Sequence, residues 1–203
     1  MRLSGYDHLT GRHCGATALF NLSDYYDWGY DEASCFGYGA GLAQRYSTVD
    51  GRPWRVFSGC GPWLERAFLD HLEIPHHIRE GDPWSPAWTD VTTQLDEGHP
   101  VLVFLDPAAL PYLMDGEHVP PHVVVVVGYD DSDILLSDGA RSALQSVPHE
   151  TFREAWDLTD PIGWTNRHIV VTRPRHLADE TDAAARATRN VAAHVLRPLD
   201  DPL

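Results

Sequence analysis

The spacing of apolar residues predicts a helical first half of the chain and a strand-rich second half. Near the start, apolar side chains recur at helical spacing at Ala16, Leu19, Phe20 and Tyr26. This pattern predicts a helix that begins at Cys14 or Gly15 and ends near Tyr26. Residues 28–42 predict a short helix that runs into a glycine-rich turn, and residues 58–62 predict a further turn. Pro62 can open a third helix, which should end before Pro75.

Short apolar runs dominate the rest of the chain. Residues 76–90 contain prolines and two tryptophans and predict a loop, and residues 91–97 predict a short helix ended by Gly98. Four compact runs predict strands, at residues 101–105, 123–127, 134–136 and 169–172, and the sequence Asp-Asp-Ser-Asp at 130–133 suits a turn between the middle two. Helices followed by mainly antiparallel strands indicate an α+β fold.

The last part of the chain has a different pattern. Asp179 can cap a helix over residues 180–196, which Pro198 would stop, and its charges suit the helix dipole. We therefore expect one domain over residues 1–175 and a helical tail over residues 176–203. This helix either packs on the domain or pairs with a second chain in a homodimer.

Composition narrows the possible partners and compartment. The 203 residues carry a formal charge of −15 and no lysine, so a nucleic-acid partner is not expected. The acidity fits either a salt-loving source or a GC-rich genome. The N-terminus lacks the apolar core of a secretory signal, and no apolar run approaches the roughly 20 residues of a membrane span. A cytoplasmic protein without membrane contact is expected. Its three cysteines predict no disulfide framework.

Cys14 is the leading candidate for a nucleophile. It lies at a predicted loop-to-helix junction, where unsatisfied backbone N–H groups and the helix dipole favour a thiolate. A small buried residue is the alternative for any free cysteine. Structural or incidental roles are expected for Cys35 and Cys60, and the histidines near Cys14 match no standard zinc spacing.

His122 is the best candidate for the base. It opens the predicted strand over residues 123–127, and Asp138 follows the next strand. If the turn centres near Asp130, these two side chains lie on one face, opposite or diagonal to each other. A carboxylate there would fix the imidazole tautomer and stabilise its cation. A surface histidine and a turn aspartate remain the alternative.

The order of these motifs resembles a known family. The segment HCGATALFNLSDYYDWGYDEASCFGYGAGL, the later LVFLDPAALPYL and the stretch HVVVVVGYDDSDILLSDG resemble the N-terminal domain of butirosin biosynthesis protein H. That family is similar in turn to the papain-like peptidases that process bacteriocin leaders. The resemblance covers roughly residues 8–172. It implies a papain-like fold, with Cys14 on a helical lobe and His122 and Asp138 on a mainly antiparallel sheet.

The resemblance also implies roles for these residues. Cys14 matches the nucleophile, His122 the base and Asp138 the orienting acid. His8 stands where papain-like peptidases carry the oxyanion-hole glutamine, six residues before the cysteine, so His8 or the Cys14 N–H becomes a candidate oxyanion donor. Cleft-lining candidates complete the expected site: His13, Gly15, Asp106 and Tyr112.

Two functions remain open on the sequence. The first is acyl transfer through a Cys14 thioester, as an acyltransferase of specialised metabolism or a related amide or thioester hydrolase. Its substrate would be an acyl-carrier-protein thioester or a peptide amide, with an amine as possible acceptor, and no cofactor or metal is expected. The second is a non-catalytic papain-like module that binds a peptide or a carrier-protein arm.

Overall fold

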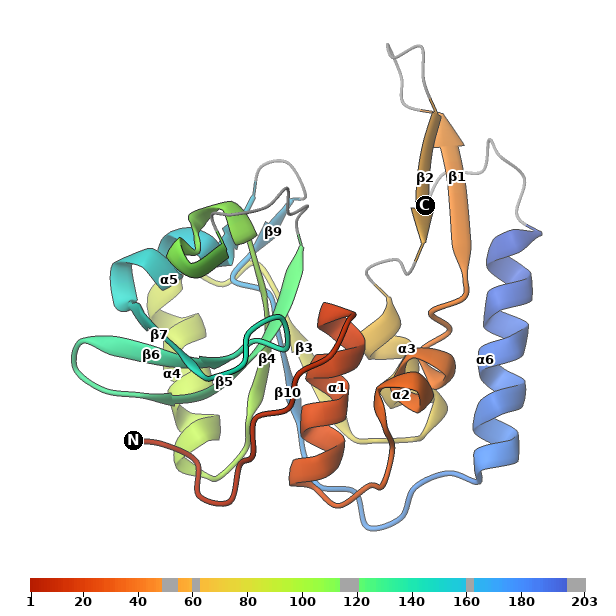
Figure 1. Cartoon of the computed structure of the whole chain (residues 1–203), viewed down its shortest axis with the longest axis horizontal. Helices are drawn as coiled ribbons and strands as arrows, with labels where there is room; N and C mark the ends of the chain where they lie inside the picture. Colours follow the sequence, from red (N-terminus) through yellow and green to blue (C-terminus); the bar gives the residue numbers. More distant parts are fainter. Residues whose placement is uncertain (49–54, 60–62, 114–120, 160–162, 197–203) are drawn as a thin grey trace.

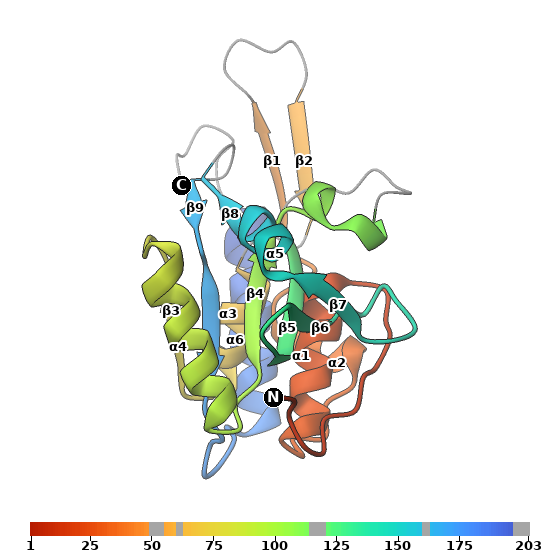
Figure 2. The same ribbon diagram turned by 90° about the vertical axis from the view of Figure 1, so that its left-hand side faces the viewer.

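Two lobes pack against each other in the computed structural model, which describes residues 1–48, 55–59, 63–113, 121–159 and 163–196. One lobe is helical and the other is built on a six-stranded antiparallel sheet of order β3-β10-β4-β5-β6-β7. Figures 1 and 2 show the helical lobe on one side of this sheet and the helices α4 and α5 on the other.

The helical lobe consists of four helices: α1 (Cys14–Tyr25), α2 (Glu32–Tyr38), α3 (Leu64–His71) and α6 (Glu180–Val195). All four were expected from the sequence near these positions. A hairpin of β1 (Gln44–Thr48) and β2 (Arg55–Gly59), which the sequence did not predict, extends away from both lobes (Figure 1). The turn expected at residues 58–62 lies largely outside the described residues.

The sheet confirms the predicted strands. They are β4 (Val101–Leu105), β5 (His122–Tyr129), β6 (Asp133–Ser137) and β10 (His168–Val171). Every residue of β4 is buried, and all of β5 except its last. Their continuous apolar sequence follows from helices that cover both faces of the sheet. The prediction of an α+β fold, with a helical lobe and a mainly antiparallel sheet, is therefore confirmed.

The predicted loop over residues 76–90 is wrong. It contains β3 (His76–Arg79) and the first part of α4 (Trp84–Asp96). Pro83 occupies the N-cap and Pro86 lies in the first turn, where the missing amide hydrogen costs no helical hydrogen bond. The prolines therefore mark the start of a helix rather than a loop.

Four further elements complete the sheet lobe. These elements, which were not predicted from the sequence, are β7 (Gln145–Pro148), α5 (His149–Trp156), β8 (Asp157–Leu158) and β9 (Trp164–Thr165). They contribute Phe152 and Trp156 to the largest fully buried side chains of the core.

A β-bulge in β5 decides which face Asp138 occupies. Between the turn and the bulge, Tyr129 pairs with Ile134 and Gly128 pairs with Leu135. Beyond the bulge the pairing has shifted by one residue, so that Val126 pairs with Leu136 and Val125 pairs with Ser137. Continued past Ser137, this register places Asp138 opposite Val124, two residues from His122 on the same face of the sheet. Without the bulge Asp138 would lie opposite Val125 and point to the other face.

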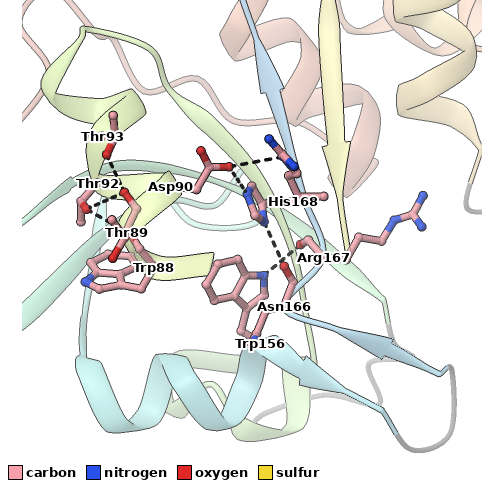
Figure 3. A network of polar contacts seen from close by, with 10 residues as sticks. Trp88, Thr89, Asp90, Thr92, Thr93, Trp156, Asn166, Arg167 and His168 are labelled. Carbon is pink, nitrogen blue, oxygen red and sulfur yellow. Dashed lines mark hydrogen bonds and ion pairs between the residues drawn. The ribbon is translucent and has the colours of Figure 1, made fainter. Parts of the chain in front are cut away.

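A buried histidine joins α4 to β10 on the far side of the sheet (Figure 3). His168 is fully buried, with Nδ1 2.9 Å from the Asn166 carbonyl oxygen and Nε2 2.9 Å from the Asp90 carboxylate. The indole N–H of Trp156 donates to the neighbouring Arg167 carbonyl at 2.9 Å. This second histidine–aspartate pair has a structural role, since it ties a helix to the sheet.

The helix α6 packs within its own chain, against α3. Arg186 donates to the Glu73 carboxylate at 2.6 Å, the rings of Trp63 and His194 stack with centroids 4.5 Å apart, and Ala183 is fully buried. Asp179 caps the helix through the N–H groups of Thr181 and Asp182, as the sequence predicts.

Candidate active site

Cys14 is the first residue of α1 and is half-buried. His13 precedes the helix in an extended conformation, and its Nδ1 accepts the N–H of Ala16 at 3.1 Å. This bond satisfies one of the amide groups in the first turn that have no partner within the helix. The thiol therefore lies at the positive end of the helix dipole, as the sequence predicts.

His122 and Asp138 form a close buried pair. The His122 Nε2 lies 2.8 Å from Asp138 Oδ2, and Asp138 is fully buried. The other carboxylate oxygen accepts the N–H of Ala140 at 3.0 Å. His122 is the first residue of β5 and pairs with Leu105 at the end of β4, so the ring is mounted on the centre of the sheet.

Cys14 and His122 meet between the lobes. The Cys14 thiol is a further hydrogen-bond partner of the His122 ring. Burial lowers the pKa of His122, but its hydrogen bonds to Asp138 and Cys14, and the charges of both groups, outweigh burial and raise the pKa to about 9. For Asp138 burial has the opposite effect and raises the pKa. The hydrogen bonds of Asp138 to His122 and Ala140 outweigh burial and hold the pKa of Asp138 below its ordinary value. The arrangement favours an imidazolium beside an ionised carboxylate at neutral pH.

Tyr112 lies behind Asp138. Its ring is half-buried, and its hydroxyl lies near the Asp138 carboxylate. The hydroxyl lowers the pKa of Asp138, although the contact does not meet the geometric criteria of a hydrogen bond. Burial and the Asp138 charge raise the pKa of Tyr112. Its backbone carbonyl accepts a hydrogen bond from Arg141. Tyr112 thus belongs to the surroundings of the pair.

His8 is engaged by protein atoms at both ring nitrogens. Nδ1 lies 2.8 Å from Ser137 Oγ, and Nε2 lies 2.8 Å from the carbonyl oxygen of Arg141. A role as oxyanion donor would require one of these bonds to break. The backbone N–H of Cys14, the other candidate donor, lies in the first turn of α1, where amide groups have no partner within the helix.

Gly15 provides space for a buried carboxyl group that the sequence did not single out. A Cβ at Gly15 would come within 1.9 Å of Glu65 Oε1 and 3.6 Å of the His13 ring. Glu65 belongs to α3 and is buried, which raises its pKa to about 7, although its own backbone N–H and the Arg167 charge oppose this. Gly15 therefore permits the close contact between α1 and α3 beside the nucleophile.

Glu32 holds the segment that precedes Cys14. Its Oε1 accepts the Thr17 hydroxyl at 2.6 Å and the backbone N–H groups of Arg12 at 2.7 Å and His13 at 2.9 Å. An acidic residue at the start of a predicted helix was the only indication of this role in the sequence. Asp106, expected to line the site, follows Leu105 and accepts the N–H of Ala108 at 2.9 Å, which caps a short 3-10 turn.

The other cysteines have different surroundings. Cys35 is fully buried in α2, and burial first, then the charges of Asp31 and Glu32, raise its pKa. Cys60 lies outside the described residues. Within the described ranges no group of three or more His, Cys, Asp or Glu side chains could hold a metal ion.

The sequence profile of the N-terminal domain of butirosin biosynthesis protein H matches residues 13–139. The chain belongs to this family. The match begins just before Cys14 and ends just after Asp138, so it spans the nucleophile, the histidine and the acid. A search of curated proteins gave no significant match.

Solved structures of peptidase domains share the fold of this butirosin protein H family member. A Bacillus anthracis protein described as a C39-like peptidase superposes with a TM-score of 0.60 at 16% identity, over 85% of this chain and 97% of the other. The peptidase domain of Streptococcus ComA, a bi-functional ABC transporter involved in quorum sensing, superposes with a TM-score of 0.53 at 15% identity, over 83% and 99% of the two chains. No helix in the described ranges combines the length and apolar character needed to cross a bilayer.

Proposed function

We propose that this family member is a cysteine-nucleophile enzyme that transfers acyl groups through a thioester on Cys14. The observation that carries the proposal is the position of the His122 ring, which has Cys14 as one hydrogen-bond partner and lies 2.8 Å from the buried Asp138 carboxylate. The buried Asp138 carboxylate and the Cys14 thiol raise its pKa to about 9 against the opposing effect of burial. A histidine that bridges a thiol and a buried carboxylate is the arrangement that a cysteine nucleophile requires.

The geometry supports a two-step reaction. The Cys14 thiolate attacks the carbonyl carbon of a thioester or amide, and the backbone N–H of Cys14 at the start of α1 stabilises the developing oxyanion. The tetrahedral intermediate collapses when the His122 imidazolium protonates the leaving thiol or amine, which leaves an acyl-cysteine. A second nucleophile, either an amine or water, then attacks the acyl-cysteine. His122 takes its proton, and the Cys14 thiolate leaves. Asp138 orients the ring through both steps.

Two classes of acyl donor fit this chemistry. The resemblance to butirosin biosynthesis protein H implies an acyl-carrier-protein thioester, and the peptidase-like fold favours a peptide amide. A thioester expels a better leaving group than an amide and places less demand on His122 as an acid. An amine acceptor would give a new amide, and water would give the free acid.

The test feeds short acyl-thioesters to the protein and follows the intact mass. We expect an acyl adduct on the wild type and on Cys35→Ala, and none on Cys14→Ala. Adding candidate amines then separates the two outcomes, since amide formed only with amine indicates a transferase and free acid in every case indicates a hydrolase. If the wild type and Cys14→Ala bind ligand equally and neither forms an adduct, the chain is a binding module instead.

A further inference from the structure

Residues 8–13, here the approach segment, connect the two halves of the candidate site. This segment leads directly into Cys14, yet several of its contacts are with the turn that carries Asp138. His8 contacts Ser137 and Arg141 through its two ring nitrogens, each at 2.8 Å. The backbone N–H of Gly11 donates to the Gly139 carbonyl at 3.0 Å. The approach segment and the acid turn, residues 137–141, are therefore joined at three points.

The same segment is fixed to the nucleophile helix. The side chain of Asn21, a buried residue two turns after Cys14 on α1, accepts the Leu9 N–H at 2.8 Å and donates to the Leu9 carbonyl at 3.0 Å. Both backbone groups of Leu9 are satisfied in this way. His8 is thus held on the helical side through its neighbour while its ring reaches the sheet side.

The two partners of His8 stand on either side of Asp138. Ser137 directly precedes the acid. Arg141 follows three residues later, and its N–H donates to the Asp138 carbonyl at 3.0 Å. Within this turn the N–H of Ala140 donates to Asp138 Oδ1 at 3.0 Å. A single imidazole therefore braces the beginning and the end of the turn that presents the carboxylate to His122.

We propose that His8 is a positioning residue, which holds Asp138 behind His122 by bracing the acid turn against the approach segment. Its catalytic consequence rests on the proposed acyl transfer, but the placement of Asp138 can be measured without any substrate. The role differs from that of an oxyanion donor, which would act on the substrate and leave the relation between Asp138 and His122 unchanged.

The hydrogen-bond chemistry of the ring supports this assignment. A backbone carbonyl only accepts, so the bond to Arg141 requires the hydrogen on Nε2. In the neutral ring Nδ1 can only accept, so the Ser137 hydroxyl donates either to Nδ1 at 2.8 Å or to Asn21 Oδ1 at 3.3 Å. In the charged ring Nδ1 donates to the Ser137 oxygen, which leaves the hydroxyl hydrogen for Asn21. Each N–H of the ring is engaged with the acid turn in either state.

The experiment measures the pKa of the His122 ring by NMR titration in wild type, His8→Ala, His8→Gln and, as control, His77→Ala, which removes an exposed histidine. We expect His8→Ala to lower the His122 pKa by about one unit or more, from about 9 toward 6.5, because a looser Asp138 stabilises the cation less. His8→Gln retains a donor for the Arg141 carbonyl and should restore part of the shift. His77→Ala should leave it unchanged.

Alkylation of Cys14 by iodoacetamide separates the proposal from its alternative, because this reaction forms no oxyanion. We expect His8→Ala to shift the pH profile of alkylation in parallel with the His122 titration. A folded His8→Ala protein with an unchanged His122 pKa and alkylation profile would overturn the proposal, and a loss confined to acyl transfer would assign His8 to the oxyanion. If His8→Ala does not fold, Ser137→Ala removes the contact at Nδ1, together with the bond of the Ser137 hydroxyl to Asn21, and leaves the bond of His8 to the Arg141 carbonyl in place. The same titration of His122 then measures its effect. An absence of acyl transfer in the wild type would remove the proposed function but not this result.

Discussion

At the scale of single residues, the candidate site depends on a balance between burial and polar contacts around His122. Burial alone would discharge this ring, as it lowers the pKa of the half-buried His13. The difference is the Asp138 carboxylate at 2.8 Å, which is itself kept ionised by the pair. The protonation state of His122 therefore depends on Asp138 as well as on the imidazole ring itself.

Asp138→Asn should make this dependence visible. Without the carboxylate charge, the His122 pKa should fall from about 9 toward or below 6.5, since burial is then opposed by Cys14 alone. His122 must carry a proton to protonate the leaving group, so the alkaline limb of the acyl-transfer profile should move to lower pH. The measurement is the rate between pH 6 and 10, with the ring titrated by NMR in parallel. An unchanged alkaline limb would contradict this role of Asp138.

The same pair links stability to pH. Below pH 6.5 the folded and unfolded states both hold the His122 proton, so the stabilisation is complete, and it is lost as pH rises through about 9. We expect the wild type to lose more thermal stability between pH 7 and 9.5 than Asp138→Asn. Equal slopes for the two proteins would mean that the pair does not retain the proton in the folded state.

Glu32 permits a test of how the nucleophile is held. Replacing it with Gln removes the charge that strengthens three hydrogen bonds to Oε1, so we expect a loss of about 1–2 kcal/mol of unfolding free energy. Slower alkylation of Cys14 should accompany this loss, because the approach segment is then less fixed. Asp31→Asn is the matched control, since Asn caps α2 about as well as Asp. An equal effect of both changes would assign the loss to α2 in general.

At the scale of elements, the spacing of apolar residues predicts those helices and strands whose position depends on nearby sequence alone. The spacing of Ala16 and Leu19 on α1, and the apolar run of β5, indicated their elements correctly. The same reasoning failed at α4, where prolines at the helix start suggested a loop. The bulge in β5 lies at the end of the apolar run, between Val126 and Gly128, and Gly128 is the only sign of it in the sequence.

Gly128, next to this bulge, offers a test of the close contact between β5 and the N-terminal residues. A Cβ there would lie 2.7 Å from the Met1 carbonyl oxygen and 3.1 Å from the Arg2 Cα, so the N-terminal backbone would have to move. We expect Gly128→Ala to destabilise the fold by about 1–3 kcal/mol, as overpacking does. Gly37→Ala is the control, because no atom lies within 4 Å of its added Cβ and alanine favours the helix α2. Chemical denaturation of both variants decides, and equal stabilities would contradict the close contact.

At the scale of the whole molecule, the candidate site is assembled from distant parts of the chain. The partners His122 and Asp138 are 16 residues apart on one hairpin, and this separation allowed a prediction of their proximity from the sequence. The partners of His8 are 129 and 133 residues away, and no local pattern can indicate such a contact. Resemblance to peptidases suggested a role for His8 at the substrate, whereas its ring contacts lie within the protein.

The helix α6 poses the last question at this scale, whether it completes the fold or joins two chains. Its inner face contacts residues at the two ends of α3, through the ion pair of Arg186 with Glu73 and the stacking of His194 on Trp63. At its end the side chain of Val195 is 59% exposed, and Leu196 is 80% exposed. The contacts of α6 within the chain and its exposed end can therefore be tested separately, because changes at Val195 and Leu196 leave the contacts of Arg186 and His194 intact.

We expect α6 to act as part of the fold. Deleting residues 176–203 should lower the unfolding free energy by about 2 kcal/mol or more, since apolar surface of α3 becomes exposed. The double change Val195→Ser and Leu196→Ser should alter neither the stability nor the molar mass in solution. Denaturation and light scattering measure the two quantities on the same samples. A wild-type dimer that becomes a monomer on the double change would instead show that α6 pairs two chains, because the contacts with α3 remain in that variant.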